Sequence, residues 1–195
     1  AGSAASPVGN PQNLFLWQAS GVGYGEFLLA MLPLAGAMLL LLLALVPLGF
    51  AARTVTVPQT DSPLPMDRWL AAVSLAAYPV FLGLVNAGLA VPAAGAVIAA
   101  FALAFRPVLR GLDWPLLAVF VLMFVDLGLL ARLPVLAEAV PAALEQPGGA
   151  YLLGAALSQV ISNVPAAIFL APFTEDWRAL AWGVSVGGFG LAIGS

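Results

Sequence analysis

The apolar segment 26–50 constrains the fold of this chain more than any other feature. It contains the aliphatic run 38–45 and is long enough to cross a bilayer, which takes roughly 20 apolar residues in a helix. Further long apolar segments occupy 68–105 and 113–131. Only 8% of the 195 residues are charged, whereas about a quarter are charged in a typical soluble domain. We therefore expect an all-α polytopic membrane protein whose solvent is the lipid bilayer.

The inventory of side chains argues against several kinds of function. The sequence has no cysteine and no histidine, and all six of its basic residues are arginines. Disulfides, the commonest metal ligand, the usual general base and a Schiff-base lysine are therefore not available from this sequence. The net charge is only −3 and the arginines are scattered, which argues against a nucleic-acid partner. We expect no enzymatic activity and no cofactor.

A polar break lies near the start of the chain, at Ser6-Pro7-Val8-Gly9-Asn10-Pro11-Gln12-Asn13. Its prolines and glycine oppose a regular helix, and non-helical backbone at membrane depth is tolerated only where protein or water satisfies its polar groups. The apolar run 11–20 that follows is too short to cross alone, so it predicts a half-helix. Secondary transporters build substrate and ion sites from broken helices of this kind.

Oxygen atoms of this break can coordinate Na⁺ or orient an anion, with the Na⁺ expected at Asn10 and Asn13. The candidate residues are Ser6, Gly9, Asn10, Pro11 and Asn13. The alternative is an ordinary Asn-Pro loop at the membrane surface.

A second polar interruption predicts a re-entrant hairpin. Two apolar segments, 150–161 and 166–173, are each too short to cross, and they flank Ser162-Asn163-Val164-Pro165. The glycine-rich stretch 187–190 predicts a second helix break. The candidate binding residues in these two places are Ser162, Asn163, Pro165, Gly188, Gly190 and Ser195. The alternatives are helix–helix hydrogen bonds and close helix packing.

Asp126 is the one acidic residue deep within an apolar segment. A charge at that depth is costly, so Asp126 is a candidate for proton or ion coupling. The alternative is a structural ion pair or a position nearer the membrane surface.

The arginines predict the orientation of the chain. Four of them, at positions 53, 68, 106 and 110, fall on one face, which the positive-inside rule makes cytoplasmic. The hairpin then enters the membrane from the outer face. We expect three parts: residues 1–25 with the first broken-helix motif, residues 26–149 with scaffold helices, and residues 150–195 with the hairpin and the start of the second broken helix.

The two polar patches also carry a family resemblance. Gly9-Asn10-Pro11-Gln12-Asn13-Leu14 resembles the first-repeat break of the citrate–arsenite permease group in the ion transporter superfamily. Ser162-Asn163-Val164-Pro165 resembles the hairpin tip of the second repeat, and 187–195 resembles the start of the second-repeat break. One departure is Ser3-Ala4-Ala5-Ser6, where the family has a Ser-Asn-Thr type signature, and this departure leaves the coupling ion and the anion open.

The resemblance implies an inverted-repeat transporter fold with a scaffold part and a mobile transport part, often as a homodimer. It implies a secondary active permease for an anion such as citrate, a dicarboxylate or arsenite, coupled to Na⁺ or H⁺ and working by alternating access. We expect an integral protein of a bacterial inner (plasma) membrane, and we expect this chain to be a fragment that runs from one break to the other. The alternatives are an ion channel or passive anion pore, and an intramembrane enzyme that would rely on carboxylates.

Overall fold

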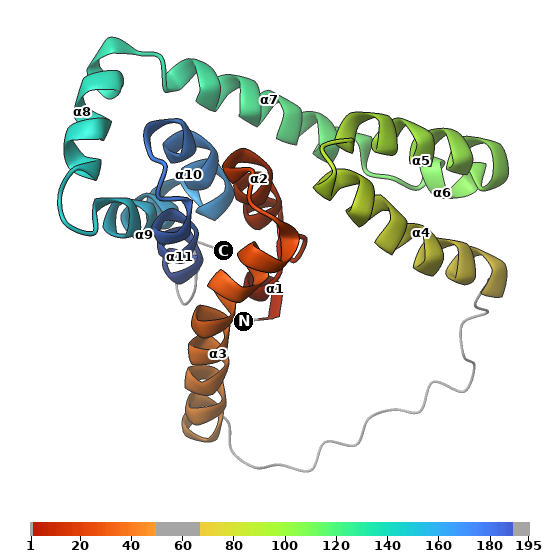
Figure 1. Ribbon diagram of the computed structural model, residues 1–195, viewed down its shortest axis with the longest axis horizontal. Helices are drawn as coiled ribbons and strands as arrows, with labels where there is room; N and C mark the ends of the chain where they lie inside the picture. The colour runs from red at the N-terminus through yellow and green to blue at the C-terminus, as the bar shows by residue number, and fades with distance from the viewer. Residues whose placement is uncertain (1, 50–66, 189–195) are drawn as a thin grey trace. The chain divides into compact units, whose positions relative to one another are not determined.

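The computed structural model describes residues 2–49 and 67–188, and every regular element in these ranges is helical (Figure 1). This confirms the prediction of an all-α membrane protein. The helices are α1 (Gly2–Ala5), α2 (Pro11–Ser20), α3 (Tyr24–Gly49), α4 (Arg68–Asn86), α5 (Ala90–Ala104), α6 (Arg106–Arg110), α7 (Trp114–Leu130), α8 (Pro134–Leu144), α9 (Gly149–Ile161), α10 (Asn163–Leu170), the 3₁₀ turn η1 (Ala171–Phe173) and α11 (Trp177–Gly187).

Two of the described helices, α3 and α4, are long and apolar enough to cross a membrane. The pair α7 and α8 reaches that length together but bends by 87° at the break between them. The predicted half-helix is α2, which has 10 residues. The two arms of the predicted hairpin are α9, with 13 residues, and α10, with 8. In the sequence, residues 132–149 read as an interfacial or extramembrane connection and residues 106–112 as a basic loop. The structure has the helix α8 in the first segment and the short helix α6 in the second.

The chain divides into two compact units. The smaller unit, Ala52–Trp114, holds α4, α5 and α6. Helices α4 and α5 meet at a turn around Gly88, whose φ of 78° favours glycine. Pro92, expected in this turn, instead lies in the first helical turn of α5, where its missing N–H costs nothing.

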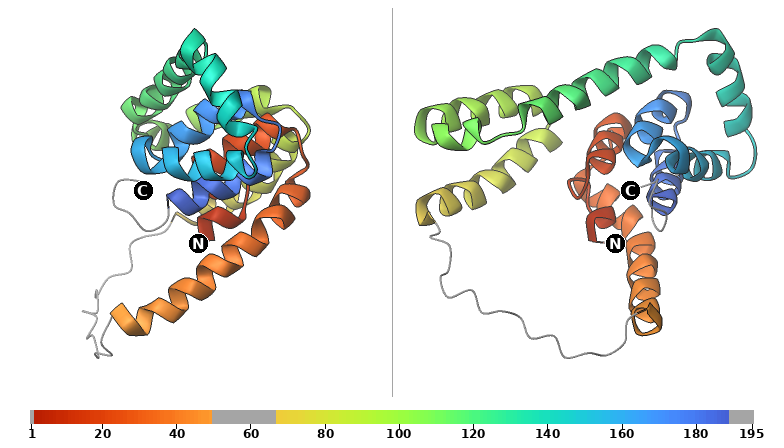
Figure 2. Two further views of the ribbon diagram at one scale, coloured as in Figure 1. Left: turned by 90° about the vertical axis from the view of Figure 1, so that its left-hand side faces the viewer. Right: turned by 180° about the vertical axis from the view of Figure 1, so that it is seen from behind.

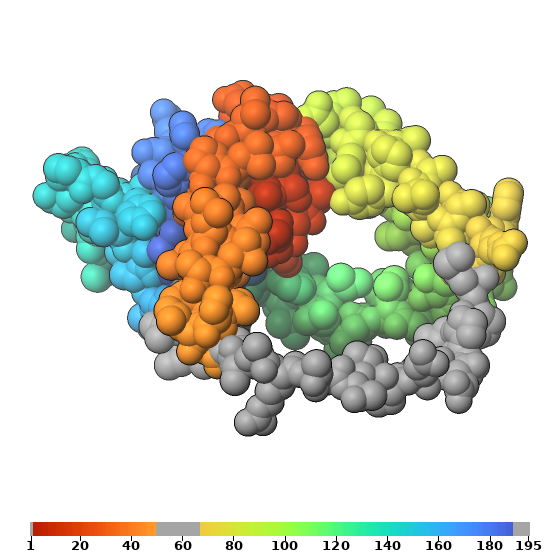
Figure 3. Space-filling model, turned by 90° about the horizontal axis from the view of Figure 1, so that it is seen from below, coloured from red at the N-terminus to blue at the C-terminus, as the bar shows by residue number. Residues whose placement is uncertain are grey.

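The larger unit joins the two ends of the chain, Ala1–Ala51 and Pro115–Ser195. Helices α10 and α11 pack against α2, although the two segments are far apart in sequence, and α9 packs against α10 and α11 (Figures 1 and 2). Helix α3 is tied to α11 by a hydrogen bond that Trp182 Nε1 donates to the Ala30 carbonyl at 3.0 Å. The stacked rings of Phe27 and Trp177, 5.0 Å apart, join the same two helices. In Figure 3, α3 (orange) lies between the α1–α2 segment (red) and the C-terminal helices (blue).

The packing of α9 on α11 depends on glycine. A Cβ added at Gly183 would overlap the carbonyl of Tyr151, and one added at Gly187 would overlap the Ser158 hydroxyl and the Ala155 carbonyl. Glycines four residues apart lie on one face of a helix, and small residues in this spacing let helix backbones approach closely in membranes. These two glycines therefore fix how near α11 comes to the first arm of the hairpin.

The predicted parts 1–25, 26–149 and 150–195 were defined by their motifs, whereas the two compact units are defined by packing. The three parts therefore stay a prediction. The unit boundaries follow packing, so helices that the sequence assigns to scaffold and to hairpin occur together in the larger unit.

We expect Gly183→Ala to destabilise the protein by about 1–3 kcal/mol, the usual cost of overfilling a packed contact. The measurement is thermal unfolding of the full-length protein in detergent. Gly128→Ala on α7 is the matched control, because its added Cβ would meet nothing within 4 Å. A Gly183→Ala variant that unfolds at the wild-type temperature would contradict the close approach of α9 and α11.

Candidate functional site

The first polar break is organised by Asn10. This residue caps α2 from an extended conformation, and its Oδ1 accepts a hydrogen bond from the backbone N–H of Asn13 at 2.7 Å. Its Nδ2 donates to the carbonyl of Ser3 at 3.1 Å, which ties the cap to α1. Pro11 occupies the first turn of α2, where a missing N–H is tolerated. The Asn-Pro pair thus starts the half-helix predicted for 11–20.

Asn13 donates hydrogen bonds to backbone carbonyls that have no helical partner in the break. Its side chain is fully buried, and its Nδ2 donates to the carbonyls of Ala4 and Ser6, each at 3.1 Å. Gly9 closes the loop with an N–H bond to the Ser6 carbonyl, and a Cβ at Gly9 would overlap the carbonyl of Ser3. Within the described residues, Asn13 Oδ1 is buried without a hydrogen-bond partner. Gln12 Oε1 is likewise buried without a partner in the described residues, so the break offers two buried acceptor oxygens.

The hairpin tip turns at Ser162. Its φ of 73° and ψ of 162° lie in a region that is nearly restricted to glycine, and it is the one non-glycine residue with positive φ in the described ranges. Asn163 Oδ1 accepts from the N–H of Val164 at 2.9 Å and from the Ser162 hydroxyl at 3.3 Å. Pro165 follows in the first turn of α10. Strain of this kind, of order 1–3 kcal/mol, is held by surrounding structure and is concentrated at functional sites.

The first break and the hairpin tip line one cavity of about 610 Å³. The break contributes Gly9, Asn10 and Pro11, and the tip contributes Val164. Helix α7 supplies an apolar wall that includes Phe124, whose ring lies 5.4 Å from that of Phe15. Because α2 begins at Pro11 and α10 begins at Asn163, the N-terminal ends of two helices meet at this cavity. Helix N-termini carry positive partial charge and free N–H groups, which suit an anion.

A buried contact between Gln12 and Ser185 links the same region to α11. Gln12 Nε2 donates to Ser185 Oγ at 3.3 Å, and the two side chains are 2% and 6% exposed. Ser185 lies three residues before Gly188, so the end of α11 is held beside the start of α2. Gly188 ends α11 with an N–H bond to the Val184 carbonyl, whereas Gly190 and Ser195 lie outside the described residues.

Sequence reasoning did not select Gln12 or Ser185 as site residues. Gln12 had a usable signal, because it lies inside the polar break. Ser185 had no such signal, because a single hydroxyl in the apolar sequence of α11 does not indicate a contact with Gln12 on α2.

Asp126 and the hairpin tip line a second cavity, of about 510 Å³. The tip contributes Ile161 and Pro165 to this cavity, so consecutive residues, Val164 and Pro165, border the two cavities. Within the described residues the Asp126 carboxylate has neither a hydrogen bond nor an ion pair. The structure thus brings together two candidates, Asp126 and Pro165, that are 39 positions apart in the sequence.

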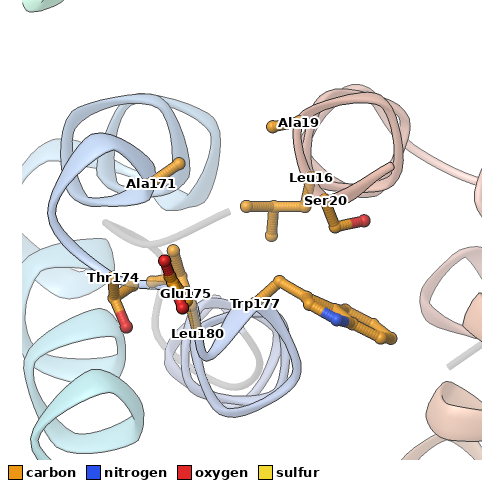
Figure 4. A pocket seen from close by; sticks show the side chains of 8 residues that line it. All are labelled: Leu16, Ala19, Ser20, Ala171, Thr174, Glu175, Trp177 and Leu180. Carbon is orange, nitrogen blue, oxygen red and sulfur yellow. The ribbon is translucent and has the colours of Figure 1, made fainter. Parts of the chain in front are cut away.

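A third cavity, of about 400 Å³, lies at the other end of α2 (Figure 4). Leu16 and Ser20 of α2 border it on one side, and Thr174, Glu175 and Trp177 border it on the other. Leu16 is one helical turn from Gln12 and is 1% exposed, so apolar packing separates this cavity from the Gln12–Ser185 contact. The described residues contain no cluster of three metal-ligating side chains.

Known proteins are similar in sequence to this chain over its whole length. The family described as citrate transporter matches residues 1–187. The chain is 42% identical to the inner membrane protein YbiR of Escherichia coli and covers 53% of it. It is 30% identical to an uncharacterized transporter, MJ0456, of Methanocaldococcus jannaschii, and 26% identical to another, Rv2684, of Mycobacterium tuberculosis, covering 52% and 54% of them. All three alignments include the whole chain, which therefore spans about half the length of these relatives.

No solved structure matches this chain. The family match confirms the resemblance to anion permeases that the first break and the hairpin tip carry in the sequence. The chain belongs to the citrate transporter family.

Proposed function

We propose that the full-length protein is a secondary active transporter for a small anion and works by alternating access. The observation that carries the proposal is the cavity shared by the first break and the hairpin tip. Its volume of about 610 Å³ falls within the range of small-molecule sites, roughly 300–1,000 Å³. The citrate transporter family and the relatives named as transporters support the same class of activity.

The anion would be held without a charged side chain. Two helix N-termini supply backbone N–H groups and positive partial charge at the cavity. The side-chain oxygens of Asn10 and Asn163 accept from the N–H groups of Asn13 and Val164, so these two side chains hold the ends of α2 and α10 in shape, and an anion would use other N–H groups of the first turns. No covalent step is needed, because the work is done by moving the bound anion from one face to the other. Citrate, a dicarboxylate and arsenite are the anions we propose.

The coupling ion is Na⁺ or H⁺. Asn10 Oδ1 is engaged in the cap of α2, whereas Asn13 Oδ1 is buried with no hydrogen-bond partner in the part of the chain that is described. Asn13 Oδ1 is therefore the side-chain oxygen we propose for Na⁺, with Asn10 and Ser6 shaping the loop around it. The name of the Escherichia coli relative supports a bacterial inner membrane as the location, and we propose a homodimer from the family resemblance.

A transport assay distinguishes a carrier from a channel. We expect the full-length protein in proteoliposomes to take up labelled citrate, succinate or arsenite with saturation. We also expect this uptake to collapse when the imposed Na⁺ and H⁺ gradients are dissipated. Conductance that is insensitive to both gradients and runs at channel rates would contradict the carrier and support an anion pore.

Substitutions at the two breaks test the site. Asn163→Ala removes the acceptor at the first turn of α10, and Asn10→Ala removes the cap of α2, a loss that usually costs about 1 kcal/mol. We expect each to reduce anion uptake at least tenfold while membrane insertion is retained, because the helix ends that border the cavity lose their caps. Uptake is measured in proteoliposomes at matched protein content.

Asn86→Ala, at the end of α4 in the smaller unit, is the control for the loss of an amide, because Asn86 is not among the residues that line the three cavities. Wild-type uptake by both Asn10→Ala and Asn163→Ala would remove the breaks from the transport site.

A further inference from the structure

The smaller unit contains a groove with a mostly apolar lining. Helices α4 and α5 run in opposite directions from the turn at Gly88 (Figure 1). Between them lies a groove of about 220 Å³, smaller than most small-molecule sites, which take roughly 300–1,000 Å³. The lining residues are Ser74, Ala77, Tyr78, Phe81, Val97 and Phe101. Those on each helix are three or four positions apart, so they form one face of α4 and one face of α5. No charged side chain lines the groove.

The groove begins near the end of the helix pair that carries the arginines. Phe101 is three residues, about 4.5 Å along the axis, before the end of α5 at Ala104. Ser74 is six residues, about 9 Å, after the start of α4 at Arg68. Phe81, at the other end of the groove, is about 20 Å from that start. The groove therefore starts within two helical turns of the basic end and runs toward the turn at the opposite end.

Two arginines follow this end of α5. Arg106 and Arg110 are four residues apart on α6, so they lie on one face of it, and both are exposed. Arg106 Nε donates to the Ala102 carbonyl at 2.9 Å, which holds its guanidinium at the last turn of α5, one residue beyond Phe101 of the groove. Within the described residues this is the one hydrogen bond of the two guanidinium groups, and neither pairs with Asp113, which follows α6. A guanidinium has five N–H donors, so both groups have donors available for an anion.

Two exposed tryptophans lie at the same end of the helix pair. Trp69, next to Arg68, is 70% exposed, and Trp114 is 50% exposed. Trp114 Nε1 donates to the Leu109 carbonyl of α6 at 3.0 Å. Tryptophan is enriched where the membrane meets water, because its ring is apolar and its N–H is polar. These positions indicate that the arginines of α6 lie at the depth of the lipid headgroups and that the groove lies in the hydrocarbon beneath them.

We propose that the smaller unit binds an anionic glycerophospholipid. The lipid phosphate contacts the guanidinium groups of Arg106 and Arg110, and one acyl chain lies in the groove between α4 and α5. Arginine suits a phosphate because its planar fork can donate two parallel hydrogen bonds. A zwitterionic phospholipid fits less well, because its cationic headgroup is repelled by the same arginines. This lipid site is separate from the transported anion and does not rest on the proposed carrier function.

The test measures lipid binding to the full-length protein in detergent by native mass spectrometry, with phosphatidylglycerol and phosphatidylcholine as probes. We expect phosphatidylglycerol to bind more tightly to wild type. Arg106→Gln and Arg110→Gln should each weaken its binding about fivefold, which is the usual contribution of one basic residue to binding an anionic membrane. Ala77→Trp should also weaken it, because the added ring fills the groove.

Two matched variants serve as controls. Arg68→Gln removes an exposed positive charge at the same end of the helix pair, and Ala76→Trp adds the same ring one residue away from the groove lining. Both should bind phosphatidylglycerol as wild type does. Glycerol 1-phosphate, which has the phosphate but no acyl chain, should not compete at the same concentration as the lipid.

Four results would overturn the proposal. The first is equal binding of the two lipids by wild type, and the second is unchanged binding of phosphatidylglycerol in both arginine variants. The third is an equal loss in Arg68→Gln, which would make the effect one of overall charge. The fourth is competition by glycerol 1-phosphate, which would make this a site for a soluble phosphate. If Ala77→Trp does not fold, the two arginine variants still decide, because both side chains are exposed.

Discussion

The larger unit depends on the hydrogen bonds that Asn13 donates to the carbonyls of Ala4 and Ser6. An interruption in a helix leaves backbone C=O groups open, and in an apolar environment each unsatisfied group costs several kcal/mol. Asn13 satisfies two carbonyls with one amide, and Asn10 supplies the acceptor that starts α2. With these bonds the chain can end one helix and begin another inside a buried region. Without them neither the direction of α2 nor the cavity at its start would be defined.

The second requirement is a hairpin held firmly enough to keep a strained tip. Ser162 adopts a backbone conformation that disfavours a side chain, so the surrounding packing must supply the difference. The close approach of α11 at Gly183 and Gly187 supplies part of it on the α9 side. The Gln12–Ser185 contact then ties α11 to the first break. The first break and the hairpin tip are therefore parts of one packed unit.

Local signals explain what could be predicted from the sequence. Asn10-Pro11 marked the start of α2 and the polar stretch 162–165 marked the hairpin tip, because caps, prolines and polar interruptions act within a few residues. The long-range contacts have no such local signal in the sequence. Nothing local pairs Gln12 with Ser185, 173 positions away, or brings Asp126 to Pro165. The helix α8 was missed because Glu138, Glu145 and Pro147 read as a polar connection, although Pro134 can begin a helix.

The two cavities beside the hairpin tip differ in the polar side chains that line them. The first cavity is bordered by the amides of Asn10 and Gln18 and by the starts of α2 and α10, and the rest of its lining is mostly apolar. The other cavity is lined by Asp126, whose side chain is exposed, and by apolar side chains of α7 and the hairpin. Val164 and Pro165 are adjacent in the chain, so any displacement of the tip alters both cavities together.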